Sequence, residues 1–326
     1  MSTSPLGGGR RMPCVLCDEA DFRLLAIRDR RGHFLRTVIC RHCGLVRHWH
    51  VPTEEELDAF YAGRYREEYH GEYLPSARRV YRAWRNGQRL VRLLRPHIGH
   101  CRSVFEIGAG IGCTVKAFEM SGWDASGLEP HRGFSRYARE VVRADVACES
   151  LWRHHSGPIY DLLLLVHVIE HLRQPIDALA RIRSWCRPGG LLYVECPNLA
   201  APFAAPGKWF HYAHIYNFTP KTLTAAAARA GWAVVRWLSR PRDPVLALLL
   251  TPGRTEQEDL SNHCDQIVSL LRSQTWFGYH VRFDYIRRRA EKLSQYVWEY
   301  LTAPYHVRCL QARWATKKPR PLRRAG

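Results

Sequence analysis

The 326-residue chain has no apolar run long enough to cross a bilayer. A membrane-spanning helix needs about 20 apolar residues in succession, and the longest apolar runs here have the length of single strands. Residues 1–13 are small, polar and glycine-rich, without the apolar stretch of a secretory signal. These absences argue against an integral membrane protein and predict a soluble, cytoplasmic one.

Acidic residues and lysine are also scarce. The chain has 49 lysine and arginine residues against 30 acidic ones, a net charge of +19, and only six of the 49 are lysine. A basic surface supplies most non-specific affinity for nucleic acid. The positive charges are spread along the chain, however, which equally fits an arginine-rich composition without a polyanionic partner. Only residues 317–324 form a dense basic run, which predicts either a peripheral contact with anionic lipid or nucleic acid, or a solvated end.

The most informative segment is an apolar strand that leads into a glycine-rich turn, VFEIGAGIG at residues 104–112. Gly108 and Gly110 lack the Cβ atoms that would keep a ligand away from the backbone, and the helix that starts near Cys113 directs its positive end at an anionic group. This arrangement predicts a nucleotide-like cofactor. Cys113 stands where the dinucleotide-binding fingerprint requires another glycine, so a nicotinamide or flavin cofactor is disfavoured.

A carboxylate follows the next expected strand. Residues 123–128 predict a short strand that ends in Glu129, 21 residues after Gly108. In a βαβ unit this position lies at the tip of the neighbouring parallel strand, where both carboxylate oxygens accept hydrogen bonds from the hydroxyls of an adenosine ribose. The alternative is a solvated acid in a loop.

Five segments in this order resemble the Rossmann-like methyltransferases that use S-adenosylmethionine, and the resemblance covers about residues 100–252. The segments are 106–112, 127–129, 144–146, 161–172 and 187–195. The resemblance implies an α/β fold with a parallel sheet, closed by an antiparallel hairpin of strands at about 232–238 and 244–250. It also implies that the cofactor contacts Glu106, Gly108, Gly110, Gly112, Glu129, Asp145, Val146 and His167.

Four of the eleven cysteines form two pairs with metal-ligand spacing. Cys14 and Cys17 form one C-x2-C pair, and Cys40 and Cys43 form another after 22 intervening residues. This pattern predicts a tetrahedral zinc site made of two knuckles. Four thiolates leave no open coordination position, so the ion is expected to be structural. Iron in the same ligand set is the alternative.

This N-terminal segment is similar to the zinc-binding segment that precedes the methyltransferase domain in enzymes of bacterial sugar and polysaccharide biosynthesis, including the sugar C-methyltransferases. The resemblance implies a sugar, a nucleotide-sugar or a glycan as the methyl acceptor. After it, Thr53 and Glu56 predict a capping box that opens a short helix. Three tyrosines then share one helical face, which either docks the zinc module on the core or faces the substrate: Tyr61, Tyr65 and Tyr69.

Methyl transfer to oxygen needs a base that takes the acceptor's proton, and histidine suits this role near neutral pH. Residues 197–218 are rich in aromatic side chains and predict a lid over a sugar acceptor. The His-Tyr-Ala-His stretch at 211–214 resembles the Tyr-His-Glu-His stretch of the sugar C-methyltransferases. Ala213 replaces the glutamate, which favours methylation of a hydroxyl over that of a carbon. His214 is therefore the first candidate for the base, followed by His171 and His211, and the alternative for His171 is a packing role.

The sequence thus predicts four parts: a zinc-binding module at 1–50, a helical linker or cap at 51–99, the methyltransferase core at 100–252 and a helical extension with the basic tail at 253–326. The extension should contain helices at 256–273 and 284–301, which form a hairpin packed on the core or on a second subunit. Five residues of the second helix are spaced for burial, namely Tyr285, Ala290, Leu293, Val297 and Leu301. Two other functions stay open: an RNA methyltransferase that uses the zinc module and basic surface, and a catalytically silent methyltransferase fold that acts as a scaffold.

Overall fold

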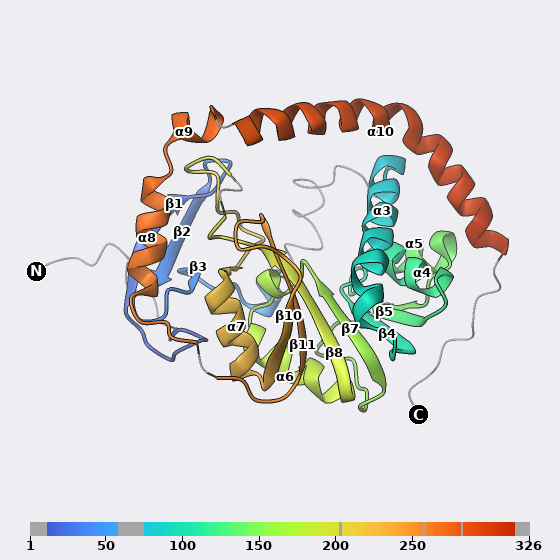
Figure 1. The fold of residues 1–326 in the computed structure, drawn as a ribbon, viewed down its shortest axis with the longest axis horizontal. Helices are drawn as coiled ribbons and strands as arrows, with labels where there is room; N and C mark the ends of the chain where they lie inside the picture. Colours follow the sequence, from blue (N-terminus) through green and yellow to red (C-terminus); the bar gives the residue numbers. More distant parts are fainter. Residues whose placement is uncertain (1–11, 58–74, 202–203, 257, 282, 317–326) are drawn as a thin grey trace, which may run out of the picture. The chain divides into compact units, whose positions relative to one another are not determined.

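The structure is a computed structural model that describes residues 12–57, 75–201, 204–256, 258–281 and 283–316 (Figure 1). Its main elements, in chain order, are β1 (Phe22–Arg28), β2 (Phe34–Cys40), β3 (Val46–His48), α3 (Ala77–Leu94), η1 (Arg95–His97), β4 (Ser103–Ile107), α4 (Cys113–Met120), β5 (Asp124–Leu128), α5 (Arg132–Tyr137), η2 (Ala138–Val142), β6 (Val146–Ala147), β7 (Tyr160–Val166), η3 (Ile169–His171), α6 (Pro175–Trp185), β8 (Cys186–Pro197), β9 (Tyr216–Asn217), α7 (Pro220–Arg229), β10 (Trp232–Trp237), β11 (Val245–Pro252), α8 (His263–Ser273), α9 (Trp276–His280) and α10 (Phe283–Thr316). Among the described helices, none combines the length and apolar character that crossing a membrane requires.

The chain divides into two compact units. The first contains Met1–Glu56, His167–Arg183 and Val194–Ile286, and the second contains Leu57–Val166, Ser184–Tyr193 and Arg287–Gly326. Each unit therefore combines segments that are far apart in the sequence.

The second unit is built on a parallel sheet. Its strands follow the order β7, β4, β5 and β6, and each neighbouring pair is parallel. The continuous apolar run at 162–165 in β7 is fully buried, as expected for a central parallel strand. In the register of β4 and β5, Ile107 lies opposite Leu128. The two strands therefore end side by side, and the loops that follow them are neighbours.

Helix α3 packs closely on α4 because of a glycine. A Cβ atom added to Gly87 would lie 2.9 Å from the backbone of Cys113 and Thr114, which is closer than side chains normally approach. The first turn of α4, directly after the glycine-rich turn, is thus held by backbone-to-backbone packing.

The first unit contains the N-terminal sheet and the hairpin of strands β10 and β11. Strands β1, β2, β3 and β9 form an antiparallel sheet in that order, so residues 216–217 add a strand to the N-terminal segment. Strands β10 and β11 pair antiparallel, with Trp232 opposite Pro252, which confirms the expected hairpin. One buried cluster joins the N-terminal sheet to α8 and to the segment after β8: Ile39, Val46, Leu199, Phe210, Cys264, Ile267, Val268 and Leu271.

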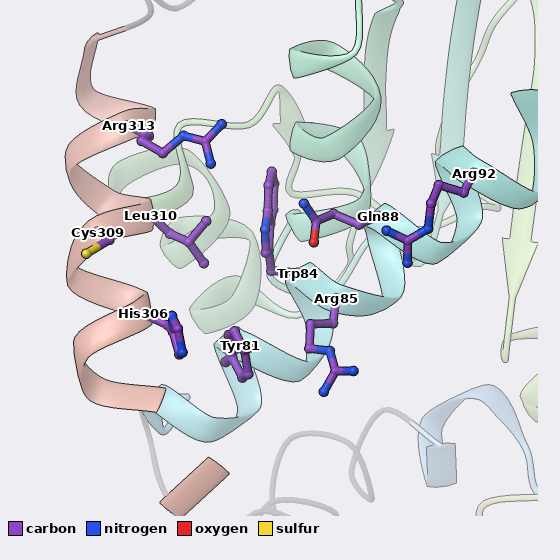
Figure 2. Close-up of a pocket in the computed structure, with 9 residues that line it drawn as sticks. All are labelled: Tyr81, Trp84, Arg85, Gln88, Arg92, His306, Cys309, Leu310 and Arg313. Atoms are coloured by element: carbon purple, nitrogen blue, oxygen red, sulfur yellow. The ribbon is translucent and has the colours of Figure 1, made fainter. Parts of the chain in front are cut away.

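Helix α10 packs on α3 through its C-terminal half. Trp314 is fully buried, and its ring meets that of Trp84 edge to face at 5.5 Å, while His306 stacks on Tyr81 at 4.8 Å. Glu299, also fully buried, accepts a hydrogen bond from Arg82. Between the two helices lies a cavity of about 420 Å³ (Figure 2). It is lined by Tyr81, Trp84, Arg85, Gln88, Arg92, His306, Cys309, Leu310 and Arg313.

The extension differs from its prediction. Helix α8 begins only at His263, and α10 continues to Thr316, past Pro304. Leu293, Val297 and Leu301 are 68%, 56% and 69% exposed, so the expectation that they are buried is wrong. The spacing correctly indicated one helical face, but the face of α10 that packs on α3 is a different one, which includes Ala303 and Trp314.

The structure tests the predicted capping box at Thr53 and Glu56 but does not describe the predicted tyrosine face. The capping box is confirmed, because the Glu56 amide donates to Oγ1 of Thr53 at 3.2 Å and the Thr53 amide donates to Oε2 of Glu56 at 2.7 Å. The side chains of Tyr285 and Ala290, and the tyrosines at 61, 65 and 69, lie outside what the structure describes.

Candidate functional site

The glycine-rich turn lies between β4 and α4 in the second unit. Gly108, Gly110 and Gly112 all adopt the left-handed backbone conformation, with φ of 73°, 53° and 75°, which glycine reaches without steric cost. A Cβ at Gly112 would lie 2.8 Å from the Cβ of Ala138, whereas a Cβ at Gly110 would meet nothing within 4 Å. Gly112 is therefore required by packing, while the backbone at Gly110 is left open to a ligand.

Glu129 ties the turn to the end of β5. Its Oε2 accepts a hydrogen bond from the Gly110 amide at 2.9 Å, and its Oε1 accepts one from the His131 amide at 2.9 Å. The residue is 8% exposed, and burial raises the pKa of its carboxyl group against the lowering effect of these two amides. A solvated loop acid would not show this burial. Each oxygen has a second lone pair that can accept from a ligand hydroxyl.

Glu106, two residues before the turn, is a buried carboxyl group. Burial is the main cause that raises its pKa to about 8; a hydrogen bond with Thr114 opposes the rise and the charge of Glu129 adds to it. Among the described residues its Oε2 has no hydrogen-bond partner. An uncompensated buried carboxyl is costly, and a cationic or hydrogen-bonding ligand group would relieve this cost.

Asp145 and Val146 border the same region. The Asp145 carbonyl accepts from the Gly127 amide at 3.0 Å, and Val146 pairs with Gly127 in the parallel register of β5 and β6. Val146 is fully buried, and its side chain would lie 3.3 Å from a Cβ at Gly112. The predicted cofactor residues of the second unit thus come together around the ends of β4, β5 and β6.

A sequence profile described as a methyltransferase domain matches residues 74–236, half of the chain. The chain belongs to this methyltransferase family. Its fold is the α/β fold of the class I methyltransferases that depend on S-adenosylmethionine. The matched range begins just before α3 and ends within β10.

Other known proteins resemble the methyltransferase more distantly. Two curated relatives, named uncharacterized protein MT1557 and uncharacterized protein Rv1509 from two strains of Mycobacterium tuberculosis, are each 21% identical over 222 residues, 56% of this chain and 74% of theirs. The solved structure of Burkholderia thailandensis 1,6-didemethyltoxoflavin-N1-methyltransferase is 19% identical, covering 68% of this chain and 96% of its own, with a TM-score of 0.47. Streptomyces venezuelae DesVI is 18% identical, covering 60% and 96%, with a TM-score of 0.43.

In the first unit of the methyltransferase, His167 is held between two carboxylates. Its Nδ1 lies 3.3 Å from Oε1 of Glu170, and its Nε2 lies 3.4 Å from Oε1 of Glu195. Burial would lower the pKa of His167, but the hydrogen bonds and charges of the two glutamates outweigh it and raise the pKa to about 9. His167 is therefore protonated near neutral pH. Its contact with the cofactor stays a prediction.

The three candidate bases of the methyltransferase lie together in the first unit. The ring centroids of His171 and His214 are 5.0 Å apart, and those of His211 and His214 are 3.7 Å apart. Nδ1 of His171 donates to the carbonyl of Ala213 at 2.6 Å. Burial lowers the pKa of His211 to about 3, and burial together with the neighbouring His171 lowers the pKa of His214 far below its ordinary value. Both of these rings are therefore neutral at pH 7, and the burial that lowers their pKa also makes them weaker bases than an exposed histidine.

The aromatic segment between β8 and α7 contributes largely to the core of the first unit. Phe210, Tyr216 and Phe218 are at most 4% exposed. The segment is fastened to the N-terminal sheet by β9 and by the His48 amide, which donates to the carbonyl of Ile215 at 3.0 Å. These three rings are therefore packed in the protein and not available for stacking on a sugar.

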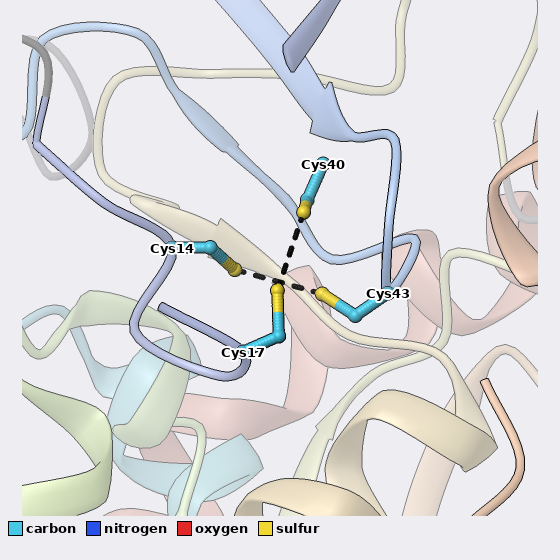
Figure 3. Close-up of side chains that lie close together, drawn as sticks. All are labelled: Cys14, Cys17, Cys40 and Cys43. Carbon is cyan, nitrogen blue, oxygen red and sulfur yellow. Dashed lines mark hydrogen bonds between the residues drawn. The ribbon is translucent and has the colours of Figure 1, made fainter. Parts of the chain in front are cut away.

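The four cysteines meet in one cluster (Figure 3). The sulfur atoms of Cys14 and Cys43 are 3.5 Å apart, as are those of Cys17 and Cys40, and all four lie within 4.8 Å of one another. Tetrahedral zinc with Zn–S bonds of about 2.3 Å would place its sulfur ligands roughly 3.8 Å apart. Hydrogen bonds from the neighbouring thiols, Cys14 first, hold the pKa of Cys40 below its ordinary value, whereas hydrogen bonds within the same cluster raise the pKa of Cys14 and Cys43. Metal binding requires the thiolate form, so the geometry of the four sulfur atoms is the observation that fits zinc.

Sequence reasoning gave no site role to the two glutamates beside His167. Glu195 directly follows the buried apolar run at 191–194 in β8, just as Glu106 follows apolar residues in β4. Glu170 is 1% exposed, and its burial had no local sequence signal, because it depends on the packing around η3.

Proposed function

We propose that this methyltransferase transfers the methyl group of S-adenosylmethionine to a hydroxyl oxygen of a sugar, a nucleotide-sugar or a glycan. The observation that best supports the cofactor assignment is the hydrogen bond between the Gly110 amide and Glu129. It brings an open backbone and a buried carboxylate to one place, which is what an adenosine ribose needs.

The residues of the second unit fit this cofactor. Glu129 accepts the two ribose hydroxyls, and Gly110 allows the ligand to approach the backbone. Glu106 offers a buried oxygen that lacks a partner among the described residues, and Asp145 and Val146 are assigned to the adenine by family resemblance. When bound, the sulfonium supplies an electrophilic methyl group.

The acceptor class rests on the N-terminal segment and the segment that follows β8. The cysteine cluster and its spacing resemble the module of sugar-modifying methyltransferases, and Ala213 stands where the carbon-methylating members have glutamate. We assign Cys14, Cys17, Cys40 and Cys43 to a structural zinc ion. The base is assigned to His214, whose neutral ring accepts the hydroxyl proton as the oxygen attacks the methyl carbon.

Calorimetry and product analysis test this function together. S-adenosylmethionine should bind to the purified full chain, and S-adenosylhomocysteine should accumulate when a mixture of nucleotide-sugars is added but not when total RNA is added. Binding without turnover on either substrate class would favour the scaffold. Turnover on RNA alone would support the RNA methyltransferase, for which the net charge of +19 is the favouring observation.

A further inference from the structure

Three side chains near η3 have the geometry of a metal site that is distinct from the cysteine cluster. Glu170, His171 and His214 each offer one ligand atom, and these atoms lie within 4.8 Å of one another. Nε2 of His171 is 3.9 Å from Oε1 of Glu170. Ligands bound to zinc at about 2.0 to 2.2 Å stand roughly 3 to 4 Å apart, so small side-chain movements suffice to close the site around an ion.

Hydrogen bonds from neighbouring groups fix the orientation of His171 and Glu170, as hydrogen bonds around metal sites fix the orientation of the ligands. Nδ1 of His171 donates to the Ala213 carbonyl, which places the lone pair of the neutral ring on Nε2, the nitrogen nearer Glu170. Ligating histidines commonly donate their other N–H to a backbone carbonyl in this way. His167 contacts Oε1 of Glu170, so the ligating carboxylate is itself held by a hydrogen bond.

An unpartnered oxygen points independently to a ligand. Glu170 is 1% exposed, and its Oε2 has no hydrogen-bond partner among the described residues. A buried carboxylate oxygen without a partner is costly unless it is paired or coordinates a metal. The adjacent His214 supplies a neutral imidazole, the form that binds metal.

We propose that Glu170, His171 and His214 bind a divalent first-row transition ion, with zinc as the reference ion. Two histidines and one glutamate are the ligands of open, catalytic-type sites, which keep a coordination position for water or a substrate oxygen. The site lies within the first unit and binds the ion whether or not the chain transfers methyl groups. The ion and the hydroxyl proton compete for the same lone pair of the His214 ring, so the role of base proposed for His214 applies to the protein without this ion.

The absorption spectrum of bound Co²⁺ distinguishes this site from the cysteine cluster. The full-length protein is stripped with a chelator and titrated with Co²⁺. Cobalt bound by thiolates shows thiolate-to-metal charge-transfer absorption, whereas cobalt bound by imidazole and carboxylate shows only d–d bands. Besides the ion in the cysteine cluster, wild type should bind about one further ion per chain that adds no charge-transfer absorption. Glu170→Gln and His214→Ala should each lose this ion, while His211→Ala, which removes an adjacent ring outside the ligand set, should keep it.

Two variants keep the test decisive if one of them fails to fold, and circular dichroism checks each. The quantity to compare is the number of cobalt ions that add no charge-transfer absorption. If this number is the same in wild type, in Glu170→Gln and in His214→Ala, the proposed site is overturned. Loss of the ion in His211→Ala together with its retention in folded Glu170→Gln would also overturn it. Because the readout is metal content, a protein that binds cobalt here and lacks methyl transfer would contradict the proposed function and not this inference.

Discussion

The amide of Gly110 donates to Oε2 of Glu129 at 2.9 Å, which links the loops that follow two neighbouring parallel strands. The glycine-rich turn and the ribose-binding acid are therefore one structural unit. Whatever binds at the open backbone of Gly110 lies close to the carboxylate, and a change at either residue affects the other.

Replacement of Glu129 by alanine should weaken S-adenosylmethionine binding by about 2 to 3 kcal/mol, because two charge-assisted hydrogen bonds to the ribose are lost. The fold should survive, although the Gly110 amide also loses its partner. Calorimetry on the folded variant measures the effect, with Glu140→Ala, an exposed glutamate paired with Arg136, as the control. Unchanged affinity in Glu129→Ala would contradict the ribose assignment.

Glu106→Gln should remove the contribution of this carboxyl group to the pH dependence of the free energy of unfolding. Burial raises the pKa of Glu106 to about 8 from 4.5. Between these values the unfolded chain has lost the proton and the folded chain keeps it, so the free energy of unfolding falls as pH rises, by up to about 1.4 kcal/mol per pH unit. The stabilising contribution of protonated Glu106 is therefore fully present below pH 4.5, decreases as the pH rises, and is lost above about pH 8.

The measurement is urea unfolding of cofactor-free protein at pH 5, 6.5 and 8. The stability of wild type relative to Glu106→Gln should decline across this series, and the exposed Glu140→Gln should follow wild type. A constant difference between wild type and Glu106→Gln would show that Glu106 is not a buried neutral acid.

The cofactor region was readable from the sequence because its signals are local. The glycines adopt positive φ, Glu106 lies near the end of the apolar strand β4, and Glu129 directly follows β5. Parallel strands then bring these residues together by register alone, as Ile107 opposite Leu128 shows. The cysteine cluster was readable for the same reason, since its four ligands lie in two short, regular pairs.

The helical extension and the glutamates around His167 were not readable in this way. Leu293, Val297 and Leu301 have helical spacing, but periodicity alone does not tell which face packs, and here α10 uses another face against α3. Likewise, His167 contacts both Glu170 on η3 and Glu195 on β8, which lie 25 residues apart in the sequence. Such contacts depend on tertiary packing between distant segments.

Gly127→Ala should destabilise the second unit, because an added Cβ would lie 2.6 Å from the backbone carbonyl of Glu106, which cannot move away cheaply. We expect a loss of roughly 1 to 3 kcal/mol in the free energy of unfolding, as for other overpacked sites. Gly99→Ala is the matched control, since its Cβ would meet nothing within 4 Å, and should change stability by less than about 0.5 kcal/mol. Equal stability of the two variants would contradict the close packing of β4 and β5.

Cys40→Ser should release the ion assigned to the cysteine cluster and loosen the N-terminal segment, because the four ligands are held together by the metal. Elemental analysis should find about one zinc per chain in the cysteine cluster of wild type and one fewer in the variant. Proteolysis should then cut first within residues 12–50. Cys148→Ser, at an exposed cysteine outside the cluster, serves as control. A folded wild type without metal in this cluster would end the zinc assignment.

His214→Ala should lower turnover by roughly 10²- to 10⁴-fold, the usual contribution of a positioned general base, with cofactor affinity nearly unchanged. His171→Ala should be milder, or act mainly through stability, because its Nδ1 fixes the Ala213 carbonyl. One turnover assay and one cofactor titration compare the two variants directly. Near-normal turnover in His214→Ala beside a collapse in His171→Ala would transfer the role of base to His171. An equal collapse in both, accompanied by loss of the same bound ion, would instead assign the activation of the hydroxyl to the metal held by Glu170, His171 and His214.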